Sequence, residues 1–528
     1  MMKDVAHIAC YSLLGSVDAA YCNLDPSSKY RMNTPHCRQT NYLALSIWFL
    51  AVCSTSQGIT LSKKESECMS KEIQRIGIIG DNSIEYLQII NDIWSSQKSV
   101  VLIDWRMPFD KINDNLTAAN VKECYVDFKI YSEIDINKYN ENMKINCINK
   151  IYKKEAREVP KEIYDKFCEN YSDDEAIVFF SSGTTGKSKG IILSHKAINL
   201  NADAVIKYLK VTNKDVIYIA KTLAHSSTMV CELLVGLKLK ARLIIAPTVV
   251  TTRFTFNNIE NYHATLIAVN PTLLVLYLDS LKEFERARAF ESIRVISCSG
   301  AILSEQTYLK AIQTFKNSKI LNVYGLSEAG PRVAAQRLCD NSKPGSVGKP
   351  INGVSVLIVD REGKILKEGE KGMVHVHTPC EFQSYINGYR KKSYYRDWLN
   401  TNDIGYLKDD NLYITGRADD MIVNGSHNVF PDDIEKVIMS FHDMKECLVF
   451  GIDDHLFGEK IICYLVLSKI IDDNITYMKE LRKHCLKELI EYEVPKEFYI
   501  VKSLPYTNNG KVSRKIAKEN YLMNKYPQ

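Results

Sequence analysis

The sequence lacks any pair of cysteines spaced as a metal motif requires. Fifteen cysteines occur in 528 residues, but they are scattered, with Cys10 and Cys22 the closest pair and no CxxC anywhere. This dispersion argues against a zinc site and against a dense disulfide scaffold. We therefore expect free thiols in a reducing compartment, and hence a cytoplasmic protein.

Long apolar runs and a strong charge of one sign are also missing. The run YLALSIWFLAVC at residues 42–53 is too short to span a bilayer, and its distance from Met1 does not suit a signal peptide. A buried helix is expected there, and no membrane span. With 68 Lys and Arg against 63 Asp and Glu, the formal net charge is only +5, and no long basic run occurs. The composition therefore indicates no nucleic acid partner.

The strongest positive signal is the segment SSGTTGKSKG at residues 181–190, which follows an apolar stretch at 176–180. This pattern predicts a strand that runs into a phosphate-binding loop. Gly183, Gly186 and Gly190 allow the backbone to approach an anion closely, and the hydroxyl and lysine ammonium groups supply hydrogen-bond donors. We expect the ligand to be a nucleotide.

The end of this segment also fits the Walker pattern GxxxxGK(S/T), through Gly186, Lys187 and Ser188. The start does not fit, because Ser181 stands where the Walker loop needs its first glycine. No aspartate-bearing strand for Mg²⁺ follows in the P-loop manner. The Walker interpretation is therefore disfavoured.

The loop is similar to the motif (T/S)SGTTGxPKG of the AMP-forming adenylate enzymes, which include acyl- and aryl-CoA synthetases, nonribosomal peptide adenylation domains and beetle luciferase. The similarity runs from Ser181 to Gly190, with Ser188 where the family usually has proline. The resemblance implies that this loop binds ATP. The ATP-binding residues so implied are Ser181, Ser182, Gly183, Thr184, Thr185, Gly186 and Lys189.

Two further segments resemble the family's adenine site. In NVYGLSE at 322–328, Tyr324 would stack on the purine, Ser327 would bond the α-phosphate, and Glu328 would approach Mg²⁺ as a catalytic and metal-binding residue. Upstream, Gly300 and Ala301 in the phrase SGA resemble the strand end against which adenine lies flat. Larger side chains would obstruct the ring there.

The segment TNDIGYL at 401–407 resembles the family's TGD turn, whose aspartate accepts hydrogen bonds from both ribose hydroxyls. Asp403 is that aspartate. Asn402 replaces the usual glycine, and asparagine enters the left-handed region more easily than most residues. In the following GRADD phrase, Arg417 would contact ribose or phosphate and Asp419 would be the hinge between two domains.

Near the C-terminus, LPYTNNGKVSRK at 504–515 resembles the family's loop LPxTxxGKxxR. The resemblance makes Lys511 the catalytic lysine. Its ammonium would neutralise charge as the carboxylate oxygen attacks the α-phosphorus and pyrophosphate leaves.

Each residue alone has an ordinary structural explanation. Asp403 could be a turn residue bonded to its own backbone, Glu328 a solvated loop acid, and Tyr324 a core aromatic. Five motifs in family order over residues 181–515 make the enzyme interpretation stronger than any single residue does.

The expected fold is α/β, with a large N-terminal domain of mostly parallel sheets flanked by helices and a small mobile α+β C-terminal domain. Apolar bursts at 100–103, 216–219 and 243–246 alternate with helical patterns, as in βαβ units. We predict an atypical N-terminal segment at 1–72, a large ATP- and acid-binding domain at 73–416, and a small domain at 417–528 that carries the catalytic lysine.

The resemblance implies two-step chemistry, in which a carboxylic acid and MgATP give acyl-AMP and a thiol then displaces AMP to give a thioester. Many CoA ligases carry two glycines beside the acceptor tunnel, and here the pair is Gly425 and Ser426. Free CoA is favoured as the thiol cosubstrate, with a carrier-protein phosphopantetheine as the alternative. A catalytically silent nucleotide-binding relative is the third hypothesis.

The acid is less well specified by the sequence. His225 takes the position at which amino-acid-activating relatives usually place an aspartate, so an α-amino acid is disfavoured and His225 is a candidate catalytic residue. The neighbouring Val230, Leu233 and Leu234 suggest an apolar pocket. A fatty or aromatic acid is therefore expected.

We predict that Lys511→Ala slows adenylation by much more than it slows thioester formation from preformed acyl-AMP. The reason is that the lysine ammonium acts on the charge that develops only at the α-phosphate. Single-turnover assays of the two half-reactions measure the difference. An equal loss in both half-reactions would contradict the assigned role.

Overall fold

The described part of the chain covers most of its length beyond residue 72. The computed structural model describes residues 73–127, 143–148, 155–181, 189–284, 290–339, 343–360, 362–386, 397–424, 427–455, 458–471, 473–507 and 512–523. The atypical segment predicted at 1–72, including the helix expected at 42–53, lies outside the described residues.

The first sheet has the strand order β17-β7-β6-β2-β1-β3-β4. Its centre is parallel, since β1 pairs with β2 and β3, and β2 pairs with β6. At one side, β6 and β7 form an antiparallel hairpin. The strands are β1 (Arg75–Ile79), β2 (Ser99–Ile103), β3 (Glu123–Val126), β4 (Lys144–Cys147), β6 (Glu175–Ser181), β7 (Lys189–Ser194) and β17 (Ser384–Tyr385).

The second sheet has the order β14-β13-β12-β11-β10-β8-β9-β5. Strands β8 to β12 pair in parallel, whereas β13 and β14 extend the sheet in the antiparallel sense. The strands are β5 (Arg157–Glu158), β8 (Val216–Ile219), β9 (Arg242–Ile245), β10 (Leu266–Val269), β11 (Val295–Cys298), β12 (Lys319–Gly325), β13 (Arg332–Ala335) and β14 (Lys349–Pro350). The strands predicted at 100–103, 216–219 and 243–246 are confirmed as β2, β8 and β9.

Helices cover both faces of the two sheets, as buried parallel strands require. The helices of this region are α3 (Ile84–Ser95), α4 (Phe109–Ala118), α6 (Lys161–Lys166), α7 (His195–Leu209), α8 (Ser226–Thr228), the π-helical turn η4 (Met229–Leu234), α9 (Val235–Leu239), α10 (Thr252–Tyr262), α11 (Pro271–Phe284), α12 (Glu305–Thr314) and the 3₁₀ turn η6 (Ser327–Ala329). Ser194, at the start of α7, illustrates why helices begin where they do, because its side chain accepts the Ala197 N–H.

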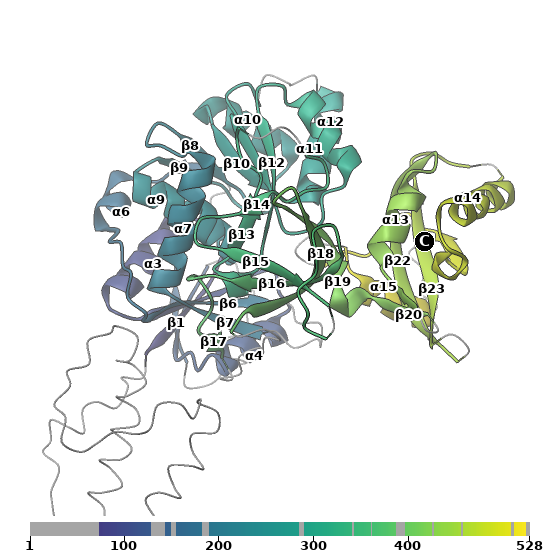
Figure 1. Ribbon diagram of the computed structural model, residues 1–528. Helices are drawn as coiled ribbons and strands as arrows, with labels where there is room; N and C mark the ends of the chain where they lie inside the picture. The colour runs from purple at the N-terminus through teal and green to yellow at the C-terminus, as the bar shows by residue number, and fades with distance from the viewer. Residues whose placement is uncertain are drawn as a thin grey trace, which may run out of the picture. The chain divides into compact units, whose positions relative to one another are not determined.

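Alternate residues of each strand belong to different cores. In β8, Ile217 joins the large core that contains α7 and η4, whereas Tyr218 joins the core beneath α10, α11 and α12. Figure 1 shows these three helices together beside β10 and β12. In β2, Val101 faces α4 and Leu102 faces the large core. The large core therefore lies between the two sheets and fixes η4 against both.

A third sheet, β15-β16-β18-β19, is antiparallel. Its strands are β15 (Ser355–Val359), β16 (Gly372–His377), β18 (Leu399–Lys408) and β19 (Asn411–Arg417). It was not foreseen from the sequence. It presents Asp403 and Arg417 on neighbouring strands.

The C-terminal sheet has the order β21-β20-β23-β22, with β24 also paired to β23. Its elements are η7 (Ala418–Asp420), β20 (Ile422–Asn424), β21 (His427–Val429), α13 (Pro431–Met439), β22 (Met444–Asp454), β23 (Gly458–Leu467), α14 (Asn474–Glu488), η8 (Glu491–Glu493), β24 (Glu497–Ile500) and α15 (Arg514–Leu522). One face packs on α13 and α14 and the other on α15.

The expected fold class is confirmed, with mostly parallel sheets in the larger part and an α+β arrangement at the C-terminal end. The boundary at residue 417 stays a prediction, although β19 ends at Arg417 and the last sheet begins only at Ile422. None of the helices in the described ranges is long and apolar enough to cross a membrane.

Gly348 provides a stability test. Its φ is +80°, and an added Cβ would lie 2.1 Å from the Ala335 carbonyl carbon, on β13. We predict that Gly348→Ala lowers the free energy of unfolding by about 3 kcal/mol or more, because backbone strain and overlap add. Gly369→Ala is the matched control, since φ there is +85° but nothing lies within 4 Å of the added Cβ. It should cost about 1 kcal/mol.

Urea denaturation followed by tryptophan fluorescence measures both glycine variants. Equal losses in the two variants would show that the close approach of Gly348 to β13 does not constrain the chain.

Candidate active site

Tyr324, Asp403 and Arg417 meet although they lie on three strands, β12, β18 and β19. Tyr324 Oη donates to Asp403 Oδ2 at 2.5 Å, and Arg417 Nη1 donates to Asp403 Oδ1 at 3.2 Å. Burial, and then the adjacent Asp403 carboxylate, raise the pKa of Tyr324 well above its usual value, so the hydroxyl remains a donor. The sequence predicted all three residues, and the structure brings them together.

The local turn explains how Asp403 is held. Asn402 has φ +64°, in the left-handed region that the sequence led us to expect for it. The Asp403 N–H donates to Thr401 Oγ1 at 3.1 Å, and only 7% of Asp403 is exposed. The carboxylate is therefore fixed by its own turn as well as by its partners.

The segment at 327–328 is tied to two other parts of the chain. Ser327 Oγ and Ser226 Oγ lie 2.7 Å apart, which joins η6 to the start of α8. Tyr385 Oη donates to Glu328 Oε1 at 2.9 Å. The Glu328 carboxylate is thus oriented by a hydroxyl from β17, at the edge of the first sheet.

The loop at 182–188 lies outside the described residues, but its two stems are described. Ser181 ends β6 and pairs with Lys189 at the start of β7. The Lys189 ammonium lies 5.7 Å from the centre of the ring of Tyr385, the residue whose hydroxyl donates to Glu328. A strand follows the loop, whereas a Walker loop leads into a helix, so the Walker interpretation is wrong. Nothing is described of Ser182, Gly183, Thr184, Thr185 and Gly186.

Gly300 and Ala301 follow β11, whose parallel neighbour is β12. Both are exposed, and Gly300 has φ +98°. They therefore lie after the carboxyl end of a strand adjacent to the one that carries Tyr324, which is where ligands bind in open α/β sheets.

His225 immediately precedes α8 and is 38% exposed at its side chain. Its Nε2 lies 4.0 Å from Asp104 Oδ2, and Arg106 binds the same carboxylate through Nε at 2.8 Å and Nη2 at 2.6 Å. Burial opposes the ionisation of Asp104, but the Arg106 guanidinium holds the pKa of Asp104 below its usual value. A carboxylate therefore faces His225.

Lys511 and the pair Gly425 and Ser426 lie outside the described residues, so their predicted roles stay predictions. The chain on either side of the lysine loop is anchored. Tyr506 and Val512 form an antiparallel bridge, and Tyr506 Oη donates to Glu446 at 2.7 Å. These contacts hold Tyr506 against β22 and pair it with Val512 across the loop.

Arg514 adds a buried ionic anchor three positions after Lys511. It donates to Asp420, Asp432 and Glu435 at 3.3, 3.3 and 2.8 Å. Burial raises the pKa of Glu435 to about 7, although Arg514 opposes the shift. Asp420 adjoins the predicted hinge Asp419, which itself lies 3.9 Å from Arg417. One guanidinium thus joins the lysine segment to the chain next to the hinge.

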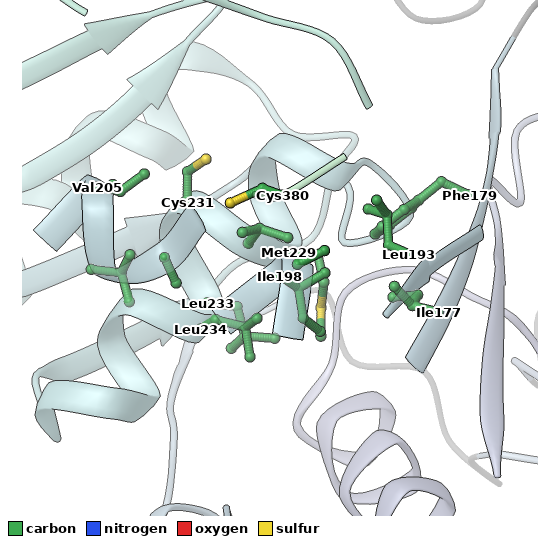
Figure 2. Close-up of a cluster of buried hydrophobic side chains, with 14 of the residues drawn as sticks. Ile177, Phe179, Leu193, Ile198, Val205, Met229, Cys231, Leu233, Leu234 and Cys380 are labelled. Carbon is green, nitrogen blue, oxygen red and sulfur yellow. The ribbon is translucent and has the colours of Figure 1, made fainter. Parts of the chain in front are cut away.

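The apolar residues expected to line an acid pocket lie inside the core. Val230, Leu233 and Leu234 are 0–1% exposed, and Figure 2 shows Leu233 and Leu234 directed away from the Cys231 thiol. They stabilise η4 against the sheets. The acid class therefore has to be inferred from other residues.

The sequence did not identify Asp104, Arg106, Ser226 and Tyr385 as partners of the predicted residues. The available signal was that Asp104 directly follows the apolar strand β2. Within the described residues, no group of three or more His, Cys, Asp or Glu side chains is arranged to hold a metal ion. The metal-binding role of Glu328 stays a prediction.

Comparison with known proteins gives a consistent result. The family model described as AMP-binding enzyme matches residues 70–386, and the model described as AMP-binding enzyme C-terminal domain matches residues 433–511. Oxalate–CoA ligase of Arabidopsis thaliana is 27% identical over 67% of this chain and 69% of its own. 2-Succinylbenzoate–CoA ligase of Bacillus subtilis is 28% identical over 74% of this chain and 76% of its own.

A solved structure supports the fold. ATP-bound MatB from Rhodopseudomonas palustris superposes with a TM-score of 0.76 at 22% identity, over 88% of this chain and 92% of that chain.

We predict that Asp403→Asn weakens ATP binding about 10- to 100-fold, because a hydrogen bond to a carboxylate is stronger than one to an amide. Isothermal titration with ATP measures the effect. Asp410→Asn is the control, since that side chain is 86% exposed and pairs with Lys349 at the surface. Similar ATP affinity in the two variants would show that Asp403 does not bind the nucleotide.

Proposed function

The chain belongs to the AMP-binding enzyme family, as an enzyme of the AMP-forming acid–CoA ligase type, and on this premise we propose that it activates a carboxylic acid as acyl-AMP and transfers the acyl group to CoA. The observation that carries the proposal is the assembly of Tyr324 and Arg417 around the buried Asp403 carboxylate. A carboxylate held by two donors on separate strands is preorganised to accept the two hydroxyls of a ribose.

In the first half-reaction, a carboxylate oxygen attacks the α-phosphorus of ATP and pyrophosphate leaves. Asp403 would hold the ribose, with Tyr324 against the purine and Arg417 beside it. The hydroxyl of Ser327, already in contact with Ser226, would donate to the α-phosphate. These groups orient the phosphorus for in-line attack.

In this step the negative charge is concentrated on the phosphate oxygens. Glu328 is the residue that would hold Mg²⁺ together with phosphate oxygens, and the ion supplies charge neutralisation. The loop at 182–188 would contribute backbone and hydroxyl donors to the same oxygens. Lys511 would bring an ammonium to the bond between the acid and the α-phosphate.

In the second half-reaction, the thiol sulfur attacks the acyl carbon and AMP leaves with the bonding electrons. We propose free CoA as the acceptor, because the oxalate and 2-succinylbenzoate relatives are both named as CoA ligases. The acceptor would reach the acyl carbon past Gly425 and Ser426, after a rotation about Asp419. A carrier-protein phosphopantetheine uses the same chemistry and is the alternative acceptor.

The acid class has two candidates. Fatty and aromatic acids were expected from apolar residues that lie in the core. Dicarboxylic acids enter because the two relatives are named for oxalate and 2-succinylbenzoate. The two classes differ in the charge at the end of the acid away from the reacting carboxylate.

Carboxylate-dependent ATP–pyrophosphate exchange is the direct test. We predict exchange with at least one acid of a panel of fatty, aromatic, dicarboxylic and amino acids, and CoA thioester when CoA is added. Heat-treated protein and reactions without acid are the controls. Exchange without CoA thioester would favour a carrier protein, whereas no exchange by folded protein would favour a silent nucleotide-binding relative.

A further inference from the structure

One short strand, β17, connects two segments of the candidate site. Its Tyr385 pairs with Ile191 of β7, the strand that follows the predicted phosphate-binding loop, and Figure 1 shows β17 beside β7. Just before β17, the Phe382 N–H donates to the carbonyl of Glu328 at 2.9 Å. The segment around β17 therefore contacts the stem of the loop in the first sheet and also η6, which follows β12 of the second sheet.

The residue after Tyr385 fixes the stem of the loop closely. The Ile386 N–H donates to the Gly190 carbonyl at 2.9 Å. A Cβ added at Gly190 would lie 2.4 Å from Ile386 Cδ1 and 3.1 Å from Phe180 Cε1. The first residues of β7 are thus packed directly against the segment that carries Tyr385.

The Tyr385 side chain contacts charged groups of opposite sign. Its hydroxyl donates to Glu328 Oε1 at 2.9 Å, and the Lys189 ammonium lies 5.7 Å from the centre of its ring, within the range of a cation–π interaction. The ring also lies 4.9 Å from the ring of Phe382, centre to centre, and only 5% of Tyr385 is exposed. One buried aromatic residue therefore contacts both an ammonium and a carboxylate that the resemblance assigns to the ATP site.

The hydroxyl of Tyr385 gives the Glu328 carboxylate a defined orientation. A carboxylate has about four acceptor positions on its two oxygens, so one donor at Oε1 orients the group and leaves positions for a cation. Carboxylates that bind metal ions are themselves hydrogen-bonded, and the loss of such a partner typically costs about 10- to 100-fold in metal affinity or activity. The contact between Tyr385 and Glu328 has the chemistry of such a partner.

Such a role belongs to one half of the reaction. Glu328 would hold Mg²⁺ together with phosphate oxygens of ATP, and pyrophosphate leaves in the first half-reaction. The thiol then attacks acyl-AMP, and this step involves no pyrophosphate. Loss of the Tyr385 hydroxyl should therefore slow adenylation and not thioester formation, whereas a general loss of packing would affect both.

We propose that Tyr385 is a positioning residue for adenylation, whose hydroxyl orients the Glu328 carboxylate for the binding of MgATP. This inference rests on the proposed function and on the metal-binding role predicted for Glu328. The pairing of β17 with β7 ties the same residue to the stem of the predicted phosphate-binding loop. Tyr385 thus keeps the carboxylate and the stem of the loop in a fixed relation to each other.

The test is Tyr385→Phe, which removes the hydroxyl and leaves the ring with its contacts to Phe382 and Lys189. Isothermal titration measures ATP affinity with and without Mg²⁺, and ATP–pyrophosphate exchange gives the Mg²⁺ concentration for the half-maximal rate. With Mg²⁺ present we expect ATP binding to weaken about 10-fold, with little change in its absence, and the half-maximal Mg²⁺ concentration to rise by a similar factor. Thioester formation from preformed acyl-AMP should keep its wild-type rate.

Coupling to Glu328 separates positioning from packing. In a Glu328→Gln background, Tyr385→Phe should cause no further loss of Mg²⁺-dependent ATP affinity, because its effect is exerted through that carboxylate. Additive losses in the double variant would overturn the proposal.

Tyr171→Phe is the matched control variant. The Tyr171 hydroxyl also lies against a carboxylate, 2.8 Å from Asp203 Oδ2, but this residue is 44% exposed. The variant should keep the wild-type Mg²⁺ dependence. If Tyr385→Phe does not fold, 3-fluorotyrosine at position 385 decides, because it keeps the ring and makes the hydroxyl a stronger donor. It should lower the half-maximal Mg²⁺ concentration, and an unchanged value would overturn the proposal.

The possible outcomes separate this inference from the proposed function. Exchange by wild-type protein together with an unchanged Mg²⁺ dependence in Tyr385→Phe overturns the role of Tyr385 and leaves the ligase function standing. Equal losses in adenylation and thioester formation overturn that role as well. Absence of exchange with every acid of the panel, by folded wild-type protein, overturns the proposed function and this inference with it.

Discussion

The Asp403 carboxylate is the contact on which the candidate site depends. It lies on β18 of the third sheet, accepts from Tyr324 of the second sheet, and accepts from Arg417 at the end of β19. One buried acid thus joins the strand expected to carry the adenine to the strand that leads toward the predicted hinge. A buried carboxylate needs such donors, because an unpaired charge in the interior is costly. Its position therefore constrains the second sheet, the third sheet and the end of β19 at Arg417.

The same principle explains a second feature of this region. Arg514 donates to Asp420, Asp432 and Glu435 and serves as an anchor, although burial raises the pKa of both Asp432 and Glu435.

The architecture gives these side chains their precision. The large core packs η4 between two sheets. Asn201, on α7, holds the backbone of Arg332 on β13 through two hydrogen bonds of its side-chain amide. The polar side chains at the strand ends therefore belong to elements that packing in the apolar core makes rigid. The apolar residues near His225 contribute to this rigidity and not to a binding surface.

The sequence by itself predicted several of the elements and, through its resemblance to the family, the candidate site residues. Period and composition predicted β2, β8 and β9, because buried parallel strands are continuous apolar runs. Local chemistry also predicted the left-handed turn at Asn402. The resemblance to the family's motifs indicated Tyr324, Asp403 and Arg417 before their contacts were visible.

Only the tertiary structure decided which of these residues meet and which others join them. Arg106, Ser226 and Tyr385 carry no local signal, since a single polar residue near an apolar run is equally consistent with a surface position. The apolar cluster at Val230 to Leu234 was misjudged for the same reason, because apolar character alone does not distinguish a pocket wall from a core. Contacts between strands more than a hundred positions apart depend on sheet order and burial, which no local pattern contains.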